Sequence, residues 1–308
     1  MENVIIYGAG ARGKGIYNYF KKHGKEDVVA GFCDRDYKCM AVFDGKKIMS
    51  FEEACGYRLP FLVSITDADV DCVRQMIERQ NGKWLCFDDM AGLFGKDRVS
   101  LNRDFCAFFH INGMDGYFES AEEMLEGFWG DGSPFLKRFQ RLDLENVIEL
   151  ACGRGRHVPR YRHKAGKVTL VDILEENIEA CKKRFGNEKN IFYYCNNGYN
   201  MEKLVSDSYT ALFSYDAMVH FEMMDIYEYL RDICRVLVPG GMALIHHSNY
   251  TGDYKASFAS APNGRSFMGR DIFAYLAYRA GFEIVEQEVI DWGVKELDCI
   301  SLIQKPKN

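Results

Sequence analysis

The chain has 308 residues, a length for which two domains are a better expectation than one. Hydrophobic residues make up 47% and charged residues 27%, which is typical of a packed globular protein and argues against long disordered regions. The net charge of −6 argues against a nucleic-acid backbone as the main partner, because neutralising phosphates needs a clustered basic surface.

Over residues 1–95, short apolar runs alternate with helical stretches. Strands are predicted at Val4–Tyr7, Val28–Phe32, Phe61–Ile65 and Trp84–Phe87, and helices at Ile16–Lys22 and Ala68–Glu78. This alternation is typical of a parallel sheet built from strand-helix-strand units. Gly45 to Lys47 is interpreted as a turn, and Ser50 with Glu53 has the spacing of a capping box.

Three glycines follow the first predicted strand in the pattern G-x-G-x-x-G, and an acidic residue follows the next strand: Gly8, Gly10, Gly13 and Asp34. This context predicts a phosphate over the N-terminus of the following helix. The segment resembles the small Rossmann-like N-terminal domains of glycan-modifying enzymes, which implies a second nucleotide-type site. Nucleotide-sugar binding, holding a partner, stabilising a homodimer and the absence of any ligand all stay open. The second half that would hold a nicotinamide is missing, which argues against a redox role. An NAD-dependent oxidoreductase acting through this domain is nevertheless kept as an alternative.

Residues 96–145 lose this alternation and become aromatic and glycine-punctuated, which predicts a helical connector or lid between two domains. Capping patterns at Ser120 with Glu123, and at Ser133 before Pro134, predict helices here. The aromatic residues are expected to pack and not to take part in chemistry: Phe108, Phe109, Tyr117, Phe118, Phe128 and Trp129.

From residue 146 to residue 308 the alternation resumes. Strands are predicted at Val147–Leu150, Val168–Val171, Ile191–Tyr194, Ala211–Ser214 and Ala243–His246, and helices at Glu175–Arg184, Asp225–Val236 and Asp271–Ala280. The late strands Phe282–Val289 and Asp298–Ile303 are predicted to add an antiparallel hairpin to a mainly parallel sheet. The whole chain is therefore predicted to be α/β, with two Rossmann-like domains.

A second glycine turn, within VIELACGRGRH at residues 147–157, follows the first strand of this later domain. Glycines permit a tight reversal and close approach of a ligand to the backbone. Asp172 ends the next strand, where a carboxylate can accept hydrogen bonds from ribose hydroxyls, and Glu149 is an unusual charge inside a strand. With the turn at Val238–Gly241, this pattern predicts nucleoside binding.

These residues resemble the class I S-adenosylmethionine-dependent methyltransferases. The family's first motif is an acidic residue followed by three glycines at alternate positions; Glu149, Gly153 and Gly155 match it, and Ala151 replaces the first glycine. The resemblance implies that S-adenosylmethionine binds here, with Asp172 on the ribose hydroxyls. Its other implied contacts are Ile173, Asn197, Gly198 and Tyr215, among which Asn197 is expected to accept from the adenine amine.

A narrower likeness, to methyltransferases of bacterial surface-sugar biosynthesis, is carried by FSYDAMVHFE at 213–222 and IHHSN at 245–249. It implies O-methylation of a sugar, nucleotide-sugar or sugar phosphate. A hydroxyl acceptor needs a base, and histidine titrates near neutrality, so His220, His246 and His247 are candidates. Because neighbours in an extended strand point to opposite faces, we expect only one of His246 and His247 to face the acceptor.

Asp216 is predicted to orient such a base, to bind an acceptor hydroxyl or to cap a turn. With His220 and His246 it has the chemistry of a divalent-metal site, but no tight spacing requires one, and no metal is predicted. Arg265 and Arg270 are candidates for gripping a phosphate or carboxylate of the acceptor, with solvated loop arginines as the alternative.

The sequence therefore predicts a cytoplasmic S-adenosylmethionine-dependent methyltransferase that acts on a small molecule through a domain at residues 146–308. The 11 cysteines show no metal-binding spacing, which is typical of free thiols in a reducing compartment. No apolar run approaches the ~20 residues that cross a membrane. The rival hypothesis from another class is a non-catalytic ligand-sensing or scaffold protein that keeps this fold without turnover.

Overall fold

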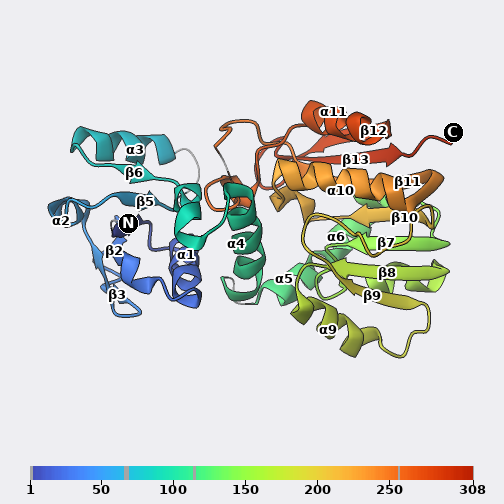
Figure 1. Cartoon of the computed structure of the whole chain (residues 1–308), viewed down its shortest axis with the longest axis horizontal. Coiled ribbons are helices and arrows are strands. Elements are labelled where there is room, and N and C mark those ends of the chain that lie inside the picture. Colours follow the sequence, from blue (N-terminus) through green and yellow to red (C-terminus); the bar gives the residue numbers. More distant parts are fainter. Residues whose placement is uncertain (1–2, 66–68, 114–115, 256, 308) are drawn as a thin grey trace. The chain divides into compact units, whose positions relative to one another are not determined.

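The computed structural model describes residues 3–65, 69–113, 116–255 and 257–307. The chain divides into two compact units (Figure 1), of which the first contains residues 1–115 and 256–265 and the second residues 116–255 and 266–308. The segment 256–265 therefore belongs to the first unit although it comes late in the chain. The stretch 96–145 is divided between the two units.

The first unit is built on a six-stranded sheet with the order β3-β4-β2-β1-β5-β6. Its strands are β1 (Val4–Tyr7), β2 (Val29–Cys33), β3 (Val42–Phe43), β4 (Lys46–Met49), β5 (Phe61–Val63) and β6 (Trp84–Leu85). Neighbouring strands are parallel, except that β3 and β4 are antiparallel. One face is covered by α1 (Ala11–Lys22), the 3-10 helix η2 (Phe87–Phe94) and α4 (Arg98–Asn112), and the other by α2 (Phe51–Gly56) and α3 (Val70–Arg79).

A strand lies at Lys46–Met49, where we predicted only a turn. Asp44 and Gly45 have positive φ angles of 47° and 77°, the conformation of a two-residue hairpin turn, and they connect β3 to β4. An Asp-Gly pair is a strong hairpin signal, so the error lies in local turn chemistry. The predicted start of the next helix, Ala68, lies outside the described residues.

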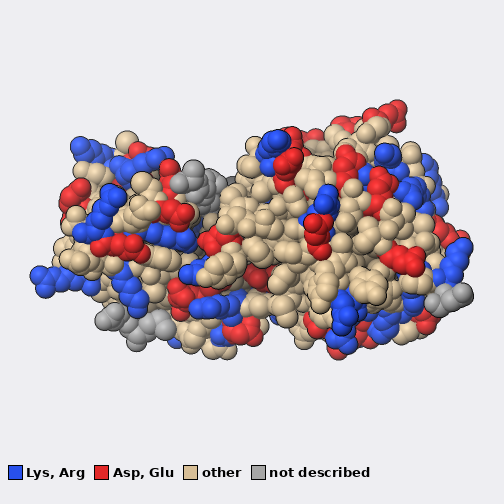
Figure 2. Space-filling view, turned by 90° about the horizontal axis from the view of Figure 1, so that it is seen from above, with Lys and Arg blue, Asp and Glu red and all other residues tan. Residues whose placement is uncertain are grey.

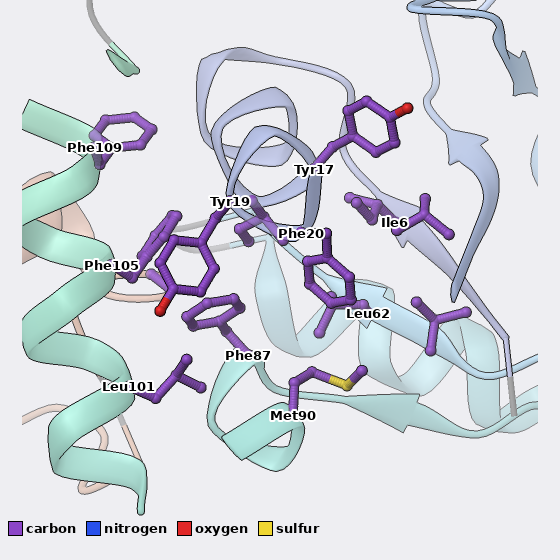
Figure 3. Packing of buried hydrophobic residues seen from close by; sticks show 14 of the residues in the cluster. Ile6, Tyr17, Tyr19, Phe20, Leu62, Phe87, Met90, Leu101, Phe105 and Phe109 are labelled. Atoms are coloured by element: carbon purple, nitrogen blue, oxygen red, sulfur yellow. The ribbon is translucent and has the colours of Figure 1, made fainter. Parts of the chain in front are cut away.

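The core of the first unit on the α1 side is aromatic (Figure 3). Tyr19 of α1 lies edge-on to Phe87 of η2 and Phe105 of α4, with ring centroids 5.9 and 5.6 Å apart. Phe258 packs on Phe105 and Phe109 at 5.9 and 5.6 Å, which anchors the late segment 256–265 in this unit. Such ring pairs stabilise a fold by about 0.5–1.5 kcal/mol each beyond their area burial.

The second unit is built on a seven-stranded sheet with the order β12-β13-β11-β10-β7-β8-β9. Its strands are β7 (Asn146–Leu150), β8 (Lys167–Asp172), β9 (Ile191–Cys195), β10 (Tyr209–Ser214), β11 (Leu237–Ser248), β12 (Glu283–Ile290) and β13 (Asp298–Gln304). All neighbours are parallel except that β13 is antiparallel to both β11 and β12. The predicted late hairpin is confirmed, and the mixed, mainly parallel sheet is consistent with the class I fold that the resemblance implies.

Helices cover both faces of this second sheet. The face that packs on α7 (Pro134–Phe139), α8 (Val158–Tyr161) and α9 (Glu175–Phe185) is opposite the face that packs on α10 (Met223–Val236) and α11 (Arg270–Ala280). Ser133 caps α7 as predicted, because its hydroxyl accepts a hydrogen bond from Leu136 N at 3.0 Å. Ser120 instead lies inside α5 (Tyr117–Glu123), which begins after Gly116, so its capping prediction was wrong.

Charged side chains of both signs are interspersed over the face of the molecule in Figure 2. Within the described residues, no helix combines the length and apolarity needed to cross a membrane. All 11 cysteines are free thiols.

Candidate functional site

The loop between β7 and α8 carries the second glycine motif at the carboxyl edge of the sheet. Ala151, Gly153 and Gly155 all have left-handed backbones, with φ angles of 57°, 55° and 73°. For alanine this conformation costs about 1–2 kcal/mol. Because strain of this kind persists only where the surroundings impose it, and gathers at functional sites, the loop is a candidate binding turn.

Asp172, the last residue of β8, holds this loop in place. Its Oδ2 accepts a hydrogen bond from Gly153 N at 2.8 Å, and its Oδ1 accepts from Leu174 N at 2.9 Å and from Asn177 Nδ2 at 3.1 Å. Burial raises the pKa of Asp172, while these hydrogen bonds oppose the shift. A carboxylate offers about four acceptor positions. The Ile173 backbone also hydrogen-bonds this carboxylate, so binding a ribose hydroxyl would require Asp172 to release a bond to its own loop.

Glu149 is 2% exposed inside β7. Its Oε2 accepts a hydrogen bond from the Tyr161 hydroxyl at 2.7 Å, whereas its Oε1 has no hydrogen-bond partner in the described part of the chain. Burial raises the pKa of Glu149 from 4.5 to about 8, although the Tyr161 bond and the Arg156 charge lower it. A buried oxygen without a partner near a strained glycine loop is a candidate contact point for a polar ligand group.

The raised pKa of Glu149 predicts a stability that falls as the pH rises. The carboxyl ionises near pH 4.5 in the unfolded chain but keeps its proton to about pH 8 in the folded one, so the folded state binds more protons between these values. The free energy of unfolding should then fall across this window, by up to about 1.4 kcal/mol per pH unit. Urea unfolding at a series of pH values checks this. Glu149→Gln should flatten the slope, and an unchanged slope in that variant would contradict the assignment.

Gly155 is required by packing inside the protein. A Cβ at this position would lie 2.6 Å from Phe185 Cε2 and 3.2 Å from Cys181 Sγ, both on α9. A Cβ at Gly153 would instead meet, among the described residues, the Phe118 ring at 3.8 Å. Of the two glycines that match the motif, Gly153 therefore has the more open surroundings for a ligand.

The loop after β9 contains Asn197, which we predicted to meet the adenine amine. Asn197 Oδ1 accepts hydrogen bonds from Tyr199 N at 3.1 Å and Asn200 N at 2.9 Å, and Nδ2 donates to Asn200 Oδ1 at 2.9 Å. The loop's own backbone occupies the predicted acceptor, so the structure does not support this role. Gly198, at φ 87°, donates its N–H to Asn196 Oδ1 at 3.3 Å and serves the same turn.

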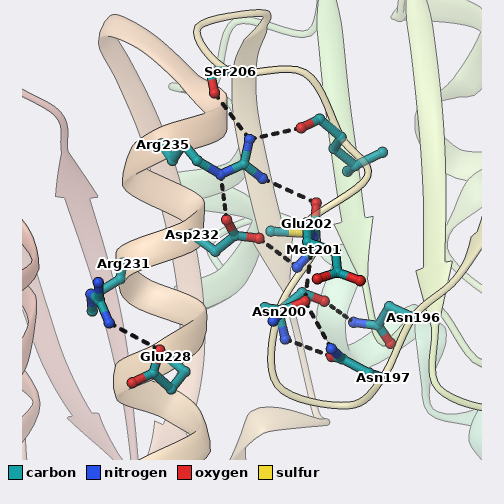
Figure 4. A network of polar contacts seen from close by, with 11 residues as sticks. Asn196, Asn197, Asn200, Met201, Glu202, Ser206, Glu228, Arg231, Asp232 and Arg235 are labelled. Atoms are coloured by element: carbon teal, nitrogen blue, oxygen red, sulfur yellow. Dashed lines mark hydrogen bonds and ion pairs between the residues drawn. The ribbon is translucent and has the colours of Figure 1, made fainter.

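Figure 4 shows how this loop is fixed to α10. Arg235 donates from Nη2 to Met201 O at 3.1 Å and from Nη1 to Leu204 O at 2.8 Å, and Asp232 accepts from Met201 N. The loop is thus held by side chains of α10, which a local sequence pattern does not reveal.

Asp216 follows β10 and has a left-handed backbone at φ 57°. Its Oδ2 lies 2.8 Å from Arg156 Nη2, and the two side chains are 10% and 13% exposed. Arg156 Nη1 also donates to Ala121 O of α5 at 3.2 Å, and its guanidinium lies 5.5 Å from the centre of the Phe128 ring. The charge pair therefore connects the glycine loop, the loop after β10 and α5.

Tyr215 and Ile173 lie beside these loops. The Tyr215 ring is 7% exposed, stacks on His246 at 4.6 Å and meets Phe128 edge-on at 5.0 Å. Burial raises the pKa of Tyr215. Ile173 O accepts a hydrogen bond from Cys195 Sγ at 3.4 Å, which joins the ends of β8 and β9.

The two adjacent histidines of β11 are both 0% exposed and lie on opposite faces of the strand. His246 Nδ1 accepts from Asp216 N at 3.1 Å, and its Nε2 pairs with Asp298 Oδ2 at 3.1 Å. His247 Nδ1 bonds Ser248 O and its Nε2 bonds Ser301 Oγ, each at 2.8 Å, and burial lowers its pKa to about 3. Both ring nitrogens of each histidine are engaged inside the protein, so the prediction that one of the pair faces the acceptor as a base is corrected.

The remaining predicted residues are spread around the chain. His220 ends a 3-10 helix, Met218–His220, and its carbonyl accepts from Ser266 Oγ at 3.0 Å. Arg265 belongs to the first unit and is 3% exposed, and this burial does not fit a side chain that grips an acceptor from solvent. Arg270 belongs to the second unit, is half exposed and pairs with Asp271 at 2.9 Å. Among the described residues, no group of three or more His, Cys, Asp or Glu side chains is arranged to hold a metal ion.

The first unit holds its own glycine loop in a similar way. Asp34 Oδ2 accepts from Ala9 N at 2.7 Å, and Oδ1 accepts from Asp36 N at 2.9 Å. A Cβ at Gly13 would lie 1.9 Å from Gly8 O, so Gly13 is needed for close packing of α1 on the loop. Gly8 has φ 104°, and a Cβ at Gly10 would meet nothing within 4 Å among the described residues. The second nucleotide-type site stays a prediction.

Sequence reasoning missed Arg156, Tyr161 and Asp298, which complete the surroundings of the glycine loop. Arg156 stands inside the quoted motif, where its charge was a usable signal. Asp298 opens a buried strand and is 0% exposed, the same anomaly that drew attention to Glu149. Tyr161 carried no distinguishing signal, because its partner becomes apparent only in the folded unit.

Residues 147–241 match the family model described as a methyltransferase domain. The matched segment begins in β7, contains the glycine loop and Asp172, and ends in β11. The match supports S-adenosylmethionine as the cofactor of the second unit. No curated protein sequence matches the chain.

Several solved structures resemble the chain, all at low identity. The S-adenosylmethionine-dependent methyltransferase from Mesorhizobium loti is 16% identical, with 57% of this chain and 99% of that chain covered and a TM-score of 0.46. The one from Methanosarcina mazei is 15% identical, with 58% and 100% covered and a TM-score of 0.47. The one from Clostridium acetobutylicum is 12% identical, with 62% and 100% covered and a TM-score of 0.47. The methyltransferase interpretation depends on the family match and not on these likenesses.

Proposed function

We propose that this protein transfers a methyl group from S-adenosylmethionine to a small oxygen nucleophile of sugar, nucleotide-sugar or sugar-phosphate type. The observation that carries the proposal is the coincidence of the methyltransferase match with a strained glycine loop, fixed by Asp172, at the carboxyl edge of the sheet. Ligands of open α/β sheets bind at this edge.

The residues present are suited to the donor. Gly153 has room for a ligand, Asp172 can bind a ribose hydroxyl in exchange for one of its loop bonds, and the Glu149 Oε1, which has no partner among the described residues, is available to a polar group of the donor. When bound, S-adenosylmethionine supplies an electrophilic methyl group on a sulfonium. The protein's own task is then to align the acceptor with that methyl group and to receive the hydroxyl proton.

The acceptor side is assigned to the loop after β10. Asp216 is joined to the glycine loop by its pair with Arg156, and we propose that it binds an acceptor hydroxyl. Phe128 and Trp292 are half-buried and stacked at 5.5 Å, and they provide an apolar surface beside Tyr215 for a sugar ring. His220, which ends the 3-10 helix after β10, is kept as the candidate for the base.

Calorimetric titration of the full chain with S-adenosylhomocysteine tests the donor site, and saturable binding is expected. Turnover is then measured as S-adenosylhomocysteine release with a panel of nucleotide-sugars and sugar phosphates. Binding without turnover on any acceptor would favour the ligand-sensing hypothesis. Binding of NAD without S-adenosylhomocysteine would favour the oxidoreductase hypothesis and contradict the proposal.

A further inference from the structure

A continuous chain of polar contacts lies beside the candidate site, and none of the motif glycines takes part in it. It begins at Asp298, the first residue of β13, which is 0% exposed. It passes through His246 of β11 to Asp216 after β10, and then to Arg156 in the glycine loop. Four segments of the second unit that are distant in sequence are joined in this way.

The hydrogen bonds fix the state of the imidazole. Asp216 N donates to His246 Nδ1 at 3.1 Å, so this nitrogen is an acceptor and carries no proton. The proton of a neutral imidazole is then on Nε2, which donates to Asp298 Oδ2 at 3.1 Å. Tyr215 and Trp292 pack on the ring at 4.6 and 5.1 Å and limit its rotation. His246 therefore acts as a rigid spacer between Asp298 and the backbone of Asp216.

The backbone of Asp216 is where this spacer acts. At φ 57° the residue has a conformation that few side chains adopt, and the bond from its N–H to His246 stabilises it. This conformation directs the carboxylate to Arg156 Nη2 at 2.8 Å. Because both partners are nearly buried, neither can leave the other without a large desolvation penalty.

The glycine loop is consequently fixed on two sides. On the β8 side Asp172 accepts from Gly153 N, and on the β10 side Asp216 holds Arg156, which also bonds Ala121 O. A loop that is already ordered loses less conformational entropy when a ligand binds to it.

We propose that Asp298, His246, Asp216 and Arg156 form a positioning relay that orders the glycine loop for the methyl donor. None of its side chains needs to touch the donor. The proposal extends the proposed function, because it assigns determinants of donor affinity to residues outside the family motif. It also gives buried His246 a structural task in place of the catalytic one.

Two readouts on the full chain test the relay. The first is calorimetric affinity for S-adenosylhomocysteine, and the second is hydrogen exchange of the 151–156 backbone in the free protein. Asp216→Asn keeps a side chain that tolerates the left-handed backbone, and His246→Phe keeps the ring but loses both hydrogen bonds. Each is expected to weaken affinity about tenfold, the equivalent of one hydrogen bond to a charged group, and to speed exchange in the loop. His246→Gln, which can accept from one partner and donate to the other, should restore most of both properties.

The matched control is Asp207→Asn, before the opposite end of β10. Asp207 also has a left-handed backbone, at φ 48°, and pairs with Lys305 Nζ at 2.6 Å. Asp207→Asn should change neither the affinity for S-adenosylhomocysteine nor the hydrogen exchange of the loop. Because His246→Phe can also lower stability, Arg156→Lys is combined with it in a double-mutant cycle. If the two residues act through the same relay, the double variant should bind S-adenosylhomocysteine no more weakly than the more impaired of the two single variants.

Additive losses in the cycle, or loop exchange and affinity unchanged in both Asp216→Asn and His246→Phe, would overturn the relay. Failure of the wild-type chain to bind S-adenosylhomocysteine would instead refute the proposed function and, with it, the assignment of the relay to a donor. The exchange measurement would still decide whether the four residues order the loop. The two failures are therefore distinguishable.

Discussion

Replacing Asp172 by alanine is expected to weaken S-adenosylhomocysteine binding about hundredfold, which corresponds to ~2.7 kcal/mol. The substitution leaves three donors without their acceptor: Gly153 N, Leu174 N and Asn177 Nδ2. Each buried donor that loses its partner costs about 1–3 kcal/mol. It also removes the carboxylate proposed to bind the ribose. Calorimetry gives the affinity, and a thermal melt separates this loss from unfolding.

Asp34→Ala is the matched control, because Asp34 holds the glycine loop of the first unit through Ala9 N and Asp36 N in the same manner. It should destabilise the first unit and leave donor affinity unchanged. Equal losses of donor affinity in Asp172→Ala and Asp34→Ala would contradict a donor site in the second unit, or would show that both losses come from general destabilisation.

Gly155→Ala is expected to lower the free energy of unfolding by about 3 kcal/mol. A left-handed alanine costs about 1–2 kcal/mol, and a Cβ 2.6 Å from Phe185 Cε2 adds about 1–3 kcal/mol of overpacking. For a unit of this size the melting temperature should fall by roughly 10 °C.

Gly153→Ala isolates the conformational part of this effect. Its φ of 55° is equally unfavourable for alanine, but its Cβ would meet only an ordinary contact with Phe118 at 3.8 Å among the described residues. It should cost about 1 kcal/mol in stability. Adding Phe185→Leu to Gly155→Ala should recover part of the loss. Equal melting temperatures for the two alanine variants would show that packing on α9 is not the reason for Gly155.

The same hydrogen-bond arrangement holds the glycine loop in both units. In each, an acidic residue at the carboxyl end of the second strand accepts the backbone N–H of a residue in the glycine loop and the N–H of the residue two positions after itself. The acidic residue therefore has a structural role before any ligand is considered. Its presence in a sequence indicates a well-ordered loop, and a ligand must be argued from further observations such as the partnerless Glu149 oxygen.

Local sequence patterns predicted the strands and helix caps well where the residues of one short segment determine its secondary structure. The alternation of apolar residues predicted β7, β8, β10 and β13, and Ser133 caps its helix as expected. The strand at Lys46–Met49 was missed because the Asp44-Gly45 turn was given too little weight.

Side-chain roles at the site were predicted less well, because they depend on partners from distant segments. The sequence indicates that Asn197 can accept a hydrogen bond, but its oxygen is taken by the backbone of its own turn. Period-two alternation correctly separates His246 and His247. It does not reveal that β13, some 50 positions later, supplies a hydrogen-bond partner to each ring.

The sequence by itself determined the α/β class of the second unit, its glycine turn and the acidic residue that ends the next strand, because strand periodicity and positive-φ turns are written in short stretches of residues. Only the tertiary structure decided which polar atoms keep a vacant position. Among these residues, Glu149 retains an oxygen without a partner in the described part of the chain, while the polar atoms of Asp172, Asn197, His246 and His247 find their partners inside the protein. The reason is that a buried polar group takes whichever partner the packing of remote strands and helices brings within hydrogen-bond distance.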